Sequence, residues 1–279
     1  MIDHDDDEHM TGPTPVIDFS NGRSLARKLD LDGAQPSYFG VEPAVATPMK
    51  AGDFTGDTRQ GGGCNASINT INPHCHGTHT ECVGHITDER RDVIDVWPND
   101  LLRARLISVR AVPAAECHDD SLPRASQPDD WIIPAAELEA ALGSYHGAFD
   151  ALIIRTLPNA KEKQVRQYID STDYPYLSTT AMQLVDALPV THFLIDTPSL
   201  DRLDDNGALE LHRLFWHLPE KARHVDSQTR TDRTVTEMIF VPNDIADGSY
   251  VLQLQAARVS GDAVLSNPVL YAMQAAEYD

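Results

Sequence analysis

The sequence predicts a single α/β domain, and two observations carry this expectation. Strand-like and helix-like segments alternate along the chain, and no change in composition divides it. A hydrophobic content of 41% in 279 residues is that of a globular protein with a substantial core. We therefore expect one domain over residues 14–279, preceded by a disordered acidic leader at residues 1–13.

The expected strands are of two kinds. Residues 14–20 form a short apolar segment, and alternation of apolar and polar residues marks 105–112, 235–241 and 250–258. Ala151–Ile154 and Phe193–Ile195 are continuous apolar runs, which is typical of buried strands. Each of these two runs is followed by a charged residue and a threonine.

Three segments have the pattern of helices. The first starts with Pro134 and extends over residues 134–142. The second, residues 178–188, begins at a capping hydroxyl and stops before a proline. Residues 207–217 form the third. The segment 33–65 is rich in glycine and proline, and we expect irregular backbone there.

The charge of the chain argues against two classes of function. With 22 basic and 43 acidic residues the formal net charge is −21, which repels nucleic acids and anionic membranes. No signal peptide or membrane-spanning run is apparent, so a cytoplasmic protein is expected. Four cysteines do not form a disulfide framework in a chain of this size and are expected to be reduced thiols.

Residues 74–85, His-Cys-His-Gly-Thr-His-Thr-Glu-Cys-Val-Gly-His, concentrate residue types that bind metals. Four of the 12 histidines lie here, together with Glu81 and two cysteines. Imidazole and carboxylate groups are suitable ligands for Zn²⁺ or Mn²⁺. The segment therefore predicts a site for one or two divalent metal ions.

The spacing within this segment suggests which side chains act together. In an extended strand alternate side chains share a face, so His79, Glu81 and His85 are expected to project together. A turn before this strand would bring either His74 or Cys75 back as a further ligand. Because few protein ligands leave positions open for water, and a divalent ion makes that water acidic, the pattern predicts a hydrolase.

The segment resembles the His-x-Gly-Thr-His-x-Asp-x-Pro-x-His signature of the putative cyclase family, which includes bacterial-type kynurenine formamidases (arylformamidases) and isatin hydrolase. Further resemblances follow in the family's order: Asp18-Phe-Ser, Ala151–Thr156, Asp196–Asp201, His212-Arg213 and Glu237. Together they span most of residues 15–265. The resemblance implies a mixed β-sheet or barrel-like core flanked by helices, of the swivelling β/β/α type.

The resemblance also implies roles for individual residues. His79 and a residue four or five positions before it would be metal ligands, Glu81 would replace a bridging aspartate, and His85 would be the general acid/base. His212 and Glu237 would complete a second metal position. The implied activity is hydrolysis of a small amide, lactam or related carbonyl compound, at a C–N bond other than a peptide bond. A homodimer or homotetramer is the implied assembly.

The signature region departs from the family at three positions. Counting back from Gly-Thr-His places the first ligand on Cys75, whereas a one-residue bulge would let His74 serve, and we favour His74. Glu81 is one methylene longer than the family's aspartate. Val83 stands where the signature has proline.

A fourth departure lies in the second half of the chain. Glu237 follows His212 by 25 residues, farther than the family spacing, and residues 217–233 resemble an insertion. Asp196 and Asp201, on either side of a proline, are expected to fix a turn by hydrogen bonds.

Three other functions are consistent with these residues. Cys64, Cys75, His79 and Cys82 could form a closed structural zinc site without catalysis. Alternatively, Cys82 or Cys75 could be the nucleophile of a thiol hydrolase with His85 as its base. A protein with the same fold could also bind its ligand without catalysis, because glutamate replaces the family's aspartate.

Overall fold

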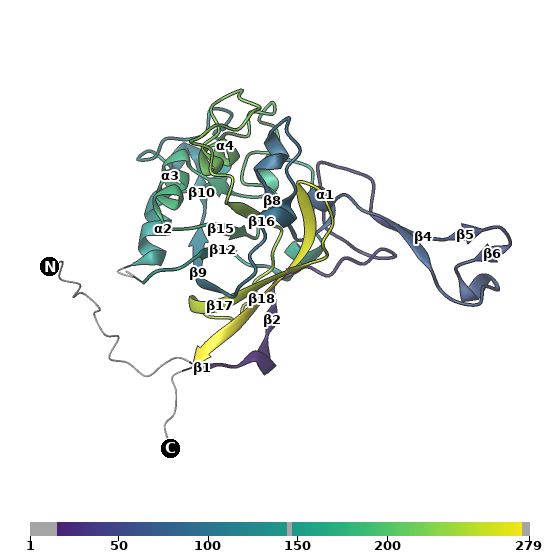
Figure 1. Ribbon diagram of the computed structural model, residues 1–279. Helices are drawn as coiled ribbons and strands as arrows, with labels where there is room; N and C mark the ends of the chain where they lie inside the picture. The colour runs from purple at the N-terminus through teal and green to yellow at the C-terminus, as the bar shows by residue number, and fades with distance from the viewer. Residues whose placement is uncertain (1–15, 144–146, 275–279) are drawn as a thin grey trace, which may run out of the picture.

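The computed structural model describes residues 16–143 and 147–274, and its centre is a closed mixed β-barrel (Figure 1). Seven strands form it: β8 (His79–Cys82), β9 (Leu102–Arg110), β12 (Ala151–Leu157), β15 (His192–Ile195), β16 (Thr234–Glu237), β17 (Gly248–Ala256) and β18 (Ala263–Gln274). Around the barrel the order is β18, β17, β9, β12, β15, β16 and β8, and β8 pairs with β18 to close it. The expected barrel-like core is thus confirmed.

The parallel strands of the barrel explain the continuous apolar runs. β12 lies between β9 and β15 and is parallel to both. Leu152 and Ile154 on one face of β12 pack into a large core with the helices. Ala151 and Ile153 on the other face belong to a second core inside the barrel. Because both faces of β12 are buried, its first four positions, Ala151–Ile154, are all apolar.

Three helices cover the outside of the barrel on one side (Figure 1). They are α2 (Ala135–Leu142), α3 (Thr179–Ala187) and α4 (Glu210–Trp216), and they confirm the three expected helices. The Ser178 hydroxyl accepts the Ala181 N–H at 2.8 Å and so caps α3. Among the described residues, no helix is both long and apolar enough to cross a bilayer.

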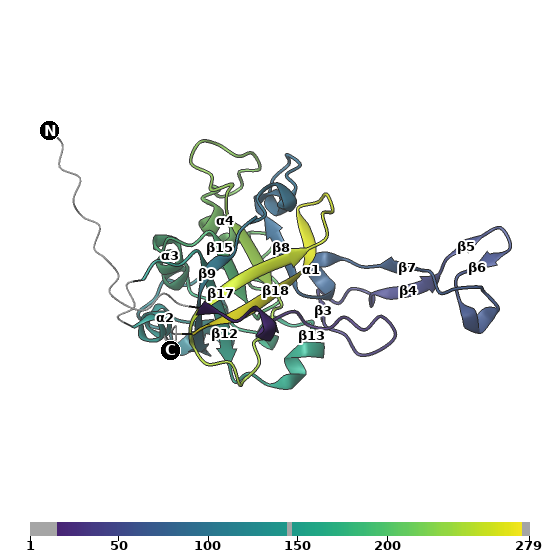
Figure 2. The ribbon, with the colours of Figure 1, turned by 60° about the horizontal axis from the view of Figure 1, so that its bottom comes forward.

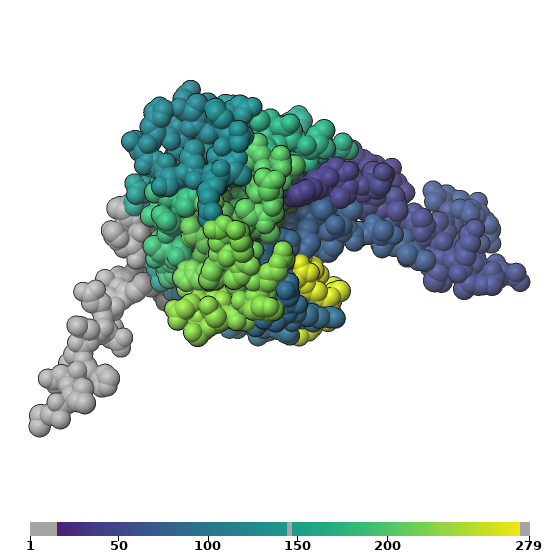
Figure 3. All heavy atoms as spheres, turned by 90° about the horizontal axis from the view of Figure 1, so that it is seen from above, coloured from purple at the N-terminus to yellow at the C-terminus, as the bar shows by residue number. Residues whose placement is uncertain are grey.

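A β-arm extends away from the barrel (Figures 2 and 3). It consists of β4 (Val45–Pro48) paired with β7 (Ser67–Thr70), and of β5 (Lys50–Ala51) paired with β6 (Phe54–Thr55) near the tip. The expectation of irregular backbone over residues 33–65 was therefore wrong in part. β-branched residues face each other across β4 and β7, as in Thr47 opposite Ile68, and favour pairing despite the glycines nearby.

Short strands complete the fold. β1 (Val16–Ile17) and β2 (Arg23–Ser24) pair with β18, while β3 (Ser37–Tyr38) pairs with β13 (Gln167–Tyr168). β10 (Val112–Pro113), β11 (Trp131–Ile133) and β14 (Tyr176–Leu177) form a three-stranded sheet.

Two expected strands are shorter than predicted. The segment 14–20 contributes only β1, followed by a 3₁₀ turn at Phe19–Asn21, and its first two residues lie outside the described residues. The segment 235–241 leaves the barrel after Glu237, because Met238 adopts a left-handed conformation with φ of 55°. The acidic leader at residues 1–13 also lies outside the described residues.

Candidate metal centre

The motif of residues 74–85 folds as a helical turn followed by a short strand. α1 (Pro73–His76) is capped by Asn72, whose side chain accepts the His74 N–H at 3.1 Å. The chain then passes through Gly77 into β8. His85 does not continue the face of β8 as expected, because residues 83–86 form a 3₁₀ turn. The helical turn returns His74 towards the strand, and the 3₁₀ turn brings His85 over it.

Strand register and α4 bring the distant residues to the motif. In the antiparallel pair of β8 and β16, His79 lies opposite Glu237, so the two side chains share a face. Glu81, two residues after His79, points to the same face. Val235, opposite Glu81, packs in the core beneath the helices, and α4 places His212 over this face.

The insertion at residues 217–233 does not separate His212 from Glu237. It leaves the end of α4 as a loop and returns to it, since the Arg230 N–H donates to the carbonyl of Trp216 at 2.8 Å. The additional residues between His212 and Glu237 therefore form a loop outside the site.

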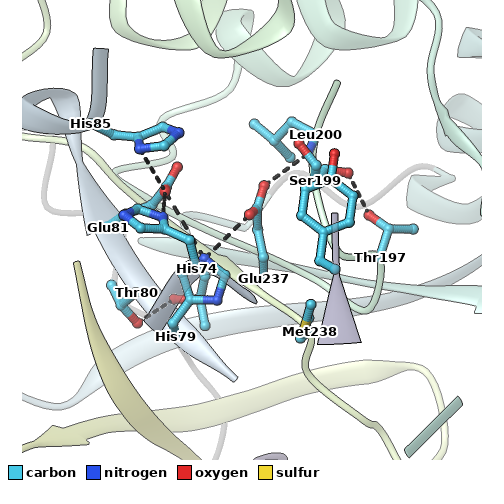
Figure 4. A network of polar contacts seen from close by, with 12 residues as sticks. His74, His79, Thr80, Glu81, His85, Thr197, Ser199, Leu200, Glu237 and Met238 are labelled. Carbon is cyan, nitrogen blue, oxygen red and sulfur yellow. Dashed lines mark hydrogen bonds and ion pairs between the residues drawn. The ribbon is translucent and has the colours of Figure 1, made fainter. Parts of the chain in front are cut away.

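The candidate ligand atoms converge around Glu81 (Figure 4). His74 Nδ1 lies 3.0 Å from Oε2 of Glu81, and His212 Nε2 lies 3.0 Å from Oε1 of Glu81. His79 Nε2 is 4.0 Å from Oε2 of Glu81 and 3.4 Å from Oε2 of Glu237. His212 Nε2 is also 3.4 Å from Oε1 of Glu237. The structure thus brings all five predicted ligand side chains together.

In His74, His79 and His212, the ring nitrogen that points away from Glu81 contacts an acceptor outside the cluster. His79 Nδ1 donates to the Gly77 carbonyl at 3.0 Å. His212 Nδ1 lies 2.6 Å from Asp201, and His74 Nε2 lies 2.8 Å from Asp262. Such an outer acceptor fixes the orientation of a histidine and the nitrogen that it presents, as is common for metal-bound histidines.

The inward atoms fit a metal cation. Within the described part of the chain, His79 Nε2, His212 Nε2 and both oxygens of Glu81 are buried atoms that make no hydrogen bond of acceptable geometry. Buried polar atoms are rarely left without a partner in proteins. Nitrogen and carboxylate donors of this kind suit Zn²⁺ or Mn²⁺, and a bound cation would satisfy them. The cluster could therefore hold a divalent ion.

The electrostatics of the centre favour positive charge. Burial raises the pKa of Glu81, but the surrounding histidines outweigh burial and hold the pKa well below its usual range. Burial lowers the pKa of His74, but its contacts with the carboxylates of Asp262 and Glu81 outweigh burial and raise the pKa to about 10. The carboxylates thus attract positive charge, which either protonated histidines or a metal ion can supply.

His85 lies at the border between this cluster and a cavity. Its Nδ1 atom is 3.5 Å from Asp262 and 3.8 Å from Glu81, and its side chain is 26% exposed. The cavity has a volume of about 440 Å³. Its walls include Tyr38, Phe39, His74, Leu203, Leu209 and His212. A small molecule in this cavity would contact both apolar walls and the polar cluster.

Among the described residues, the groups that could hold a metal ion include no cysteine, although Cys75 lines the cavity. Cys75 lies in a small apolar cluster with tyrosines, while Cys82, the last residue of β8, lies in another with Val93 and Val264. Cys64 is exposed and lies between β6 and β7 of the β-arm. The structural zinc cage is therefore not formed, and His74 rather than Cys75 faces Glu81. Burial raises the pKa of Cys82 to about 12, which argues against a nucleophilic thiolate there.

Asp262 also belongs to this cluster, although it was not predicted from the sequence. This residue joins His74 and His85 from the connection between β17 and β18. The only sequence signal is an acidic residue after Ser260-Gly261, just before a strand-like run. Its proximity to the motif results from closure of the barrel, which local sequence does not encode.

A protein family and several solved structures are similar to this chain. The sequence profile of the putative cyclase family matches residues 8–202. No curated protein matches the chain by sequence. Among solved structures, a predicted metal-dependent hydrolase from Bacillus stearothermophilus is 12% identical with a TM-score of 0.55, and the match covers 90% of this chain and 98% of the other.

Two solved isatin hydrolases are similar as well. Isatin hydrolase A from Labrenzia aggregata is 12% identical with a TM-score of 0.56, and the match covers 91% of this chain and 94% of the other. Isatin hydrolase A from Ralstonia solanacearum is 14% identical with a TM-score of 0.53, covering 90% and 91%. At these identities the likeness establishes a shared fold.

Proposed function

This chain belongs to the putative cyclase family, and on that premise we propose that it is a metal-dependent hydrolase of a small amide, lactam or related carbonyl compound. The observation that carries the proposal is the set of buried, inward-facing ring nitrogens and carboxylate oxygens beside a cavity. The names of structurally similar proteins, which include isatin hydrolases and a metal-dependent hydrolase, support it.

Five side chains would hold the metal. His74, His79 and Glu81 would bind one Zn²⁺ or Mn²⁺ ion, since their ligand atoms lie within 4.8 Å of one another. Glu81 presents its second oxygen to His212, so a second ion would be held by Glu81, His212 and Glu237. When bound, the metal would polarise a carbonyl group and lower the pKa of a water molecule.

The protein's own groups would orient the substrate and move the proton. His85 borders the cavity and can accept a proton from the attacking water and deliver it to the leaving nitrogen. The apolar walls formed by Phe39, Leu203 and Leu209 would hold a small, flat substrate and limit the access of water. A small-molecule substrate is therefore the proposed ligand.

Metal content is the first test of this proposal. Protein purified without a histidine tag should contain about one to two equivalents of Zn²⁺ or Mn²⁺ per chain by elemental analysis. The variant His79→Ala should lose most of the metal, whereas His224→Ala, a 73% exposed histidine side chain, should retain it. A metal-free wild type with full hydrolytic activity would overturn the proposal.

The second test is an activity screen with metal-loaded protein. The substrates are N-formylkynurenine, isatin and small lactams and lactones. We expect hydrolysis of at least one of them and a loss of about 10²-fold or more in kcat for His85→Ala, with metal content retained. Metal binding without hydrolysis of any substrate would instead favour a non-catalytic binding protein of this fold.

We also propose a homodimer or homotetramer. The β-arm projects from the barrel and leaves Val45, Met49 and Ile68 exposed, a pattern that a second copy could cover. Light scattering coupled to size exclusion should give twice or four times the mass of one chain. A monomer at micromolar concentration would contradict this assembly.

A further inference from the structure

Asp262 is a carboxylate of the site that lies far from the motif in sequence. Its backbone is held beside the motif where β18 pairs with β8 to close the barrel. Ala263 lies opposite Glu81 in this pairing, and the Cys82 N–H donates to the Asp262 carbonyl at 3.0 Å. The position of Asp262 is therefore fixed by the same strand that carries Glu81.

One oxygen of Asp262 faces two histidines. Oδ2 lies 2.8 Å from His74 Nε2 and 3.5 Å from His85 Nδ1. The two imidazole rings stack, with centroids 4.3 Å apart and an interplanar angle of 29°. The carboxylate thus joins a proposed metal ligand to the proposed general acid/base.

The nitrogen that each histidine presents depends on this contact. If Asp262 accepts the Nε2–H of His74, the lone pair of that histidine is on Nδ1, the atom that faces Glu81. If Asp262 accepts the Nδ1–H of His85, the lone pair of His85 is on Nε2. Each histidine then has the tautomer that its proposed role requires.

We propose that Asp262 is a positioning residue that sets the tautomer and orientation of both His74 and His85, and so couples metal binding to proton transfer. This inference rests on the proposed metal-dependent function. Asp201 and the Gly77 carbonyl each hold one histidine, whereas Asp262 serves two. The Asp262 side chain is 42% exposed, so its replacement should leave the fold intact.

The test compares three variants with the wild type. Asp262→Ala removes the acceptor, Asp262→Asn keeps an acceptor oxygen without the charge, and Asp244→Ala is the control. Asp244 is a 67% exposed carboxylate whose ion pair is with Arg23 and not with a histidine. The readouts are Zn²⁺ affinity by competition with a chelator, and histidine tautomers from ¹⁵N–¹H correlation spectra of the zinc-loaded proteins.

We expect about 10- to 100-fold weaker Zn²⁺ binding in Asp262→Ala, with partial recovery in Asp262→Asn and no change in Asp244→Ala. The spectra should show Nε2–H for His74 and Nδ1–H for His85 in the wild type, and a mixture of tautomers for His85 in Asp262→Ala. Circular dichroism should confirm that all three variants are folded.

Three outcomes would overturn the inference. Wild-type affinity and tautomers in Asp262→Ala would show that Asp262 positions neither histidine. Loss of one whole equivalent of zinc, with the remaining affinity unchanged, would make Asp262 a direct ligand of an outer ion with His74 and His85. A wild type that binds no zinc or manganese would remove the proposed function itself, and with it this role of Asp262.

Discussion

Asp201 holds His212 through both the side chain and the backbone. Its Oδ2 atom lies 2.6 Å from His212 Nδ1 and also accepts the His212 N–H at 3.2 Å. Its Oδ1 atom accepts the N–H of Leu211 at 2.7 Å. Asp201 therefore accepts two N–H groups from the first turn of α4 and, at the same time, directs His212 Nε2 towards Glu81.

Replacing Asp201 by asparagine should weaken metal binding and folding together. Asparagine offers one acceptor oxygen, and its amide group would oppose one of the N–H donors. We expect about 10- to 100-fold weaker Zn²⁺ binding and a loss of about 1–3 kcal/mol in the free energy of unfolding. Chelator competition and urea denaturation measure the two effects.

Asp205→Asn is the matched control for this variant. Asp205 accepts the N–H groups of Gly207 and Leu209 just before α4, but its hydrogen bonds do not include His212. The control should lose stability while retaining Zn²⁺ affinity. Equal losses of Zn²⁺ affinity in the two variants would mean that the order of α4, rather than the contact with His212, controls binding.

The choice between His74 and Cys75 gives a second prediction. His74 Nδ1 lies 3.0 Å from Glu81, whereas Cys75 is 7% exposed and packs in an apolar cluster with Tyr168 and Met238. His74→Ala should therefore lose most of its bound metal by elemental analysis. Cys75→Ala should retain the metal and lose about 1 kcal/mol of stability, as is usual for a small buried truncation. The reverse pattern would make the thiolate the ligand.

Sequence patterns identified those parts of the fold that depend on local chemistry. The apolar runs of β12 and β15 follow from burial of both strand faces, and the capping hydroxyl of Ser178 marks the start of α3. The helical turn of α1 was not predicted, because four residues carry too little periodicity. The β-arm was missed since its many glycines conceal short pairing segments.

The site residues within the compact motif 74–85 were predictable from the sequence. The residues that the barrel topology brings to this motif were less so. His79 and Glu81 share a face because they are two residues apart in a strand. His212 and Glu237 could be named only by resemblance to a family, since their approach depends on the packing of α4 and the register of β16. Asp262 was indicated neither by strand spacing nor by the family resemblance, because only closure of the barrel brings it to the motif.

A third prediction concerns the glutamate that replaces the family's aspartate. The two oxygens of Glu81 reach His74 on one side and His212 on the other, each at 3.0 Å. Removing one methylene would withdraw the carboxylate from both, so Glu81→Asp should bind Zn²⁺ at least about 10-fold more weakly. Glu81→Gln, whose side chain has the same length but no charge, should lose more Zn²⁺ affinity than Glu81→Asp. If Glu81→Asp instead gains hydrolytic activity, the glutamate would be the reason that the wild-type site is not catalytic.

The pH dependence of stability gives a fourth prediction, at a histidine outside the metal centre. His192 is 5% exposed at the start of β15, and its Nδ1 atom lies 2.8 Å from the Thr234 hydroxyl. Burial lowers the pKa of His192 to about 4, and the nearby carboxylates of Asp150 and Asp232 oppose this effect only in part. The ordinary pKa of histidine, about 6.5, applies to the unfolded chain.

Between these two pKa values the unfolded chain binds a proton that the folded chain does not. The contribution of His192 to the free energy of unfolding is therefore complete above about pH 6.5 and falls as the pH decreases towards 4, by up to about 1.4 kcal/mol per pH unit. Urea denaturation of the wild type and of His192→Gln across this range measures the effect. Carboxylates contribute to both proteins, so the difference between the curves isolates His192. Between pH 7 and pH 4 the free energy of unfolding should fall by about 2–3 kcal/mol more in the wild type than in the variant. Parallel curves of stability against pH would mean that His192 becomes protonated in the folded protein as readily as in the unfolded chain.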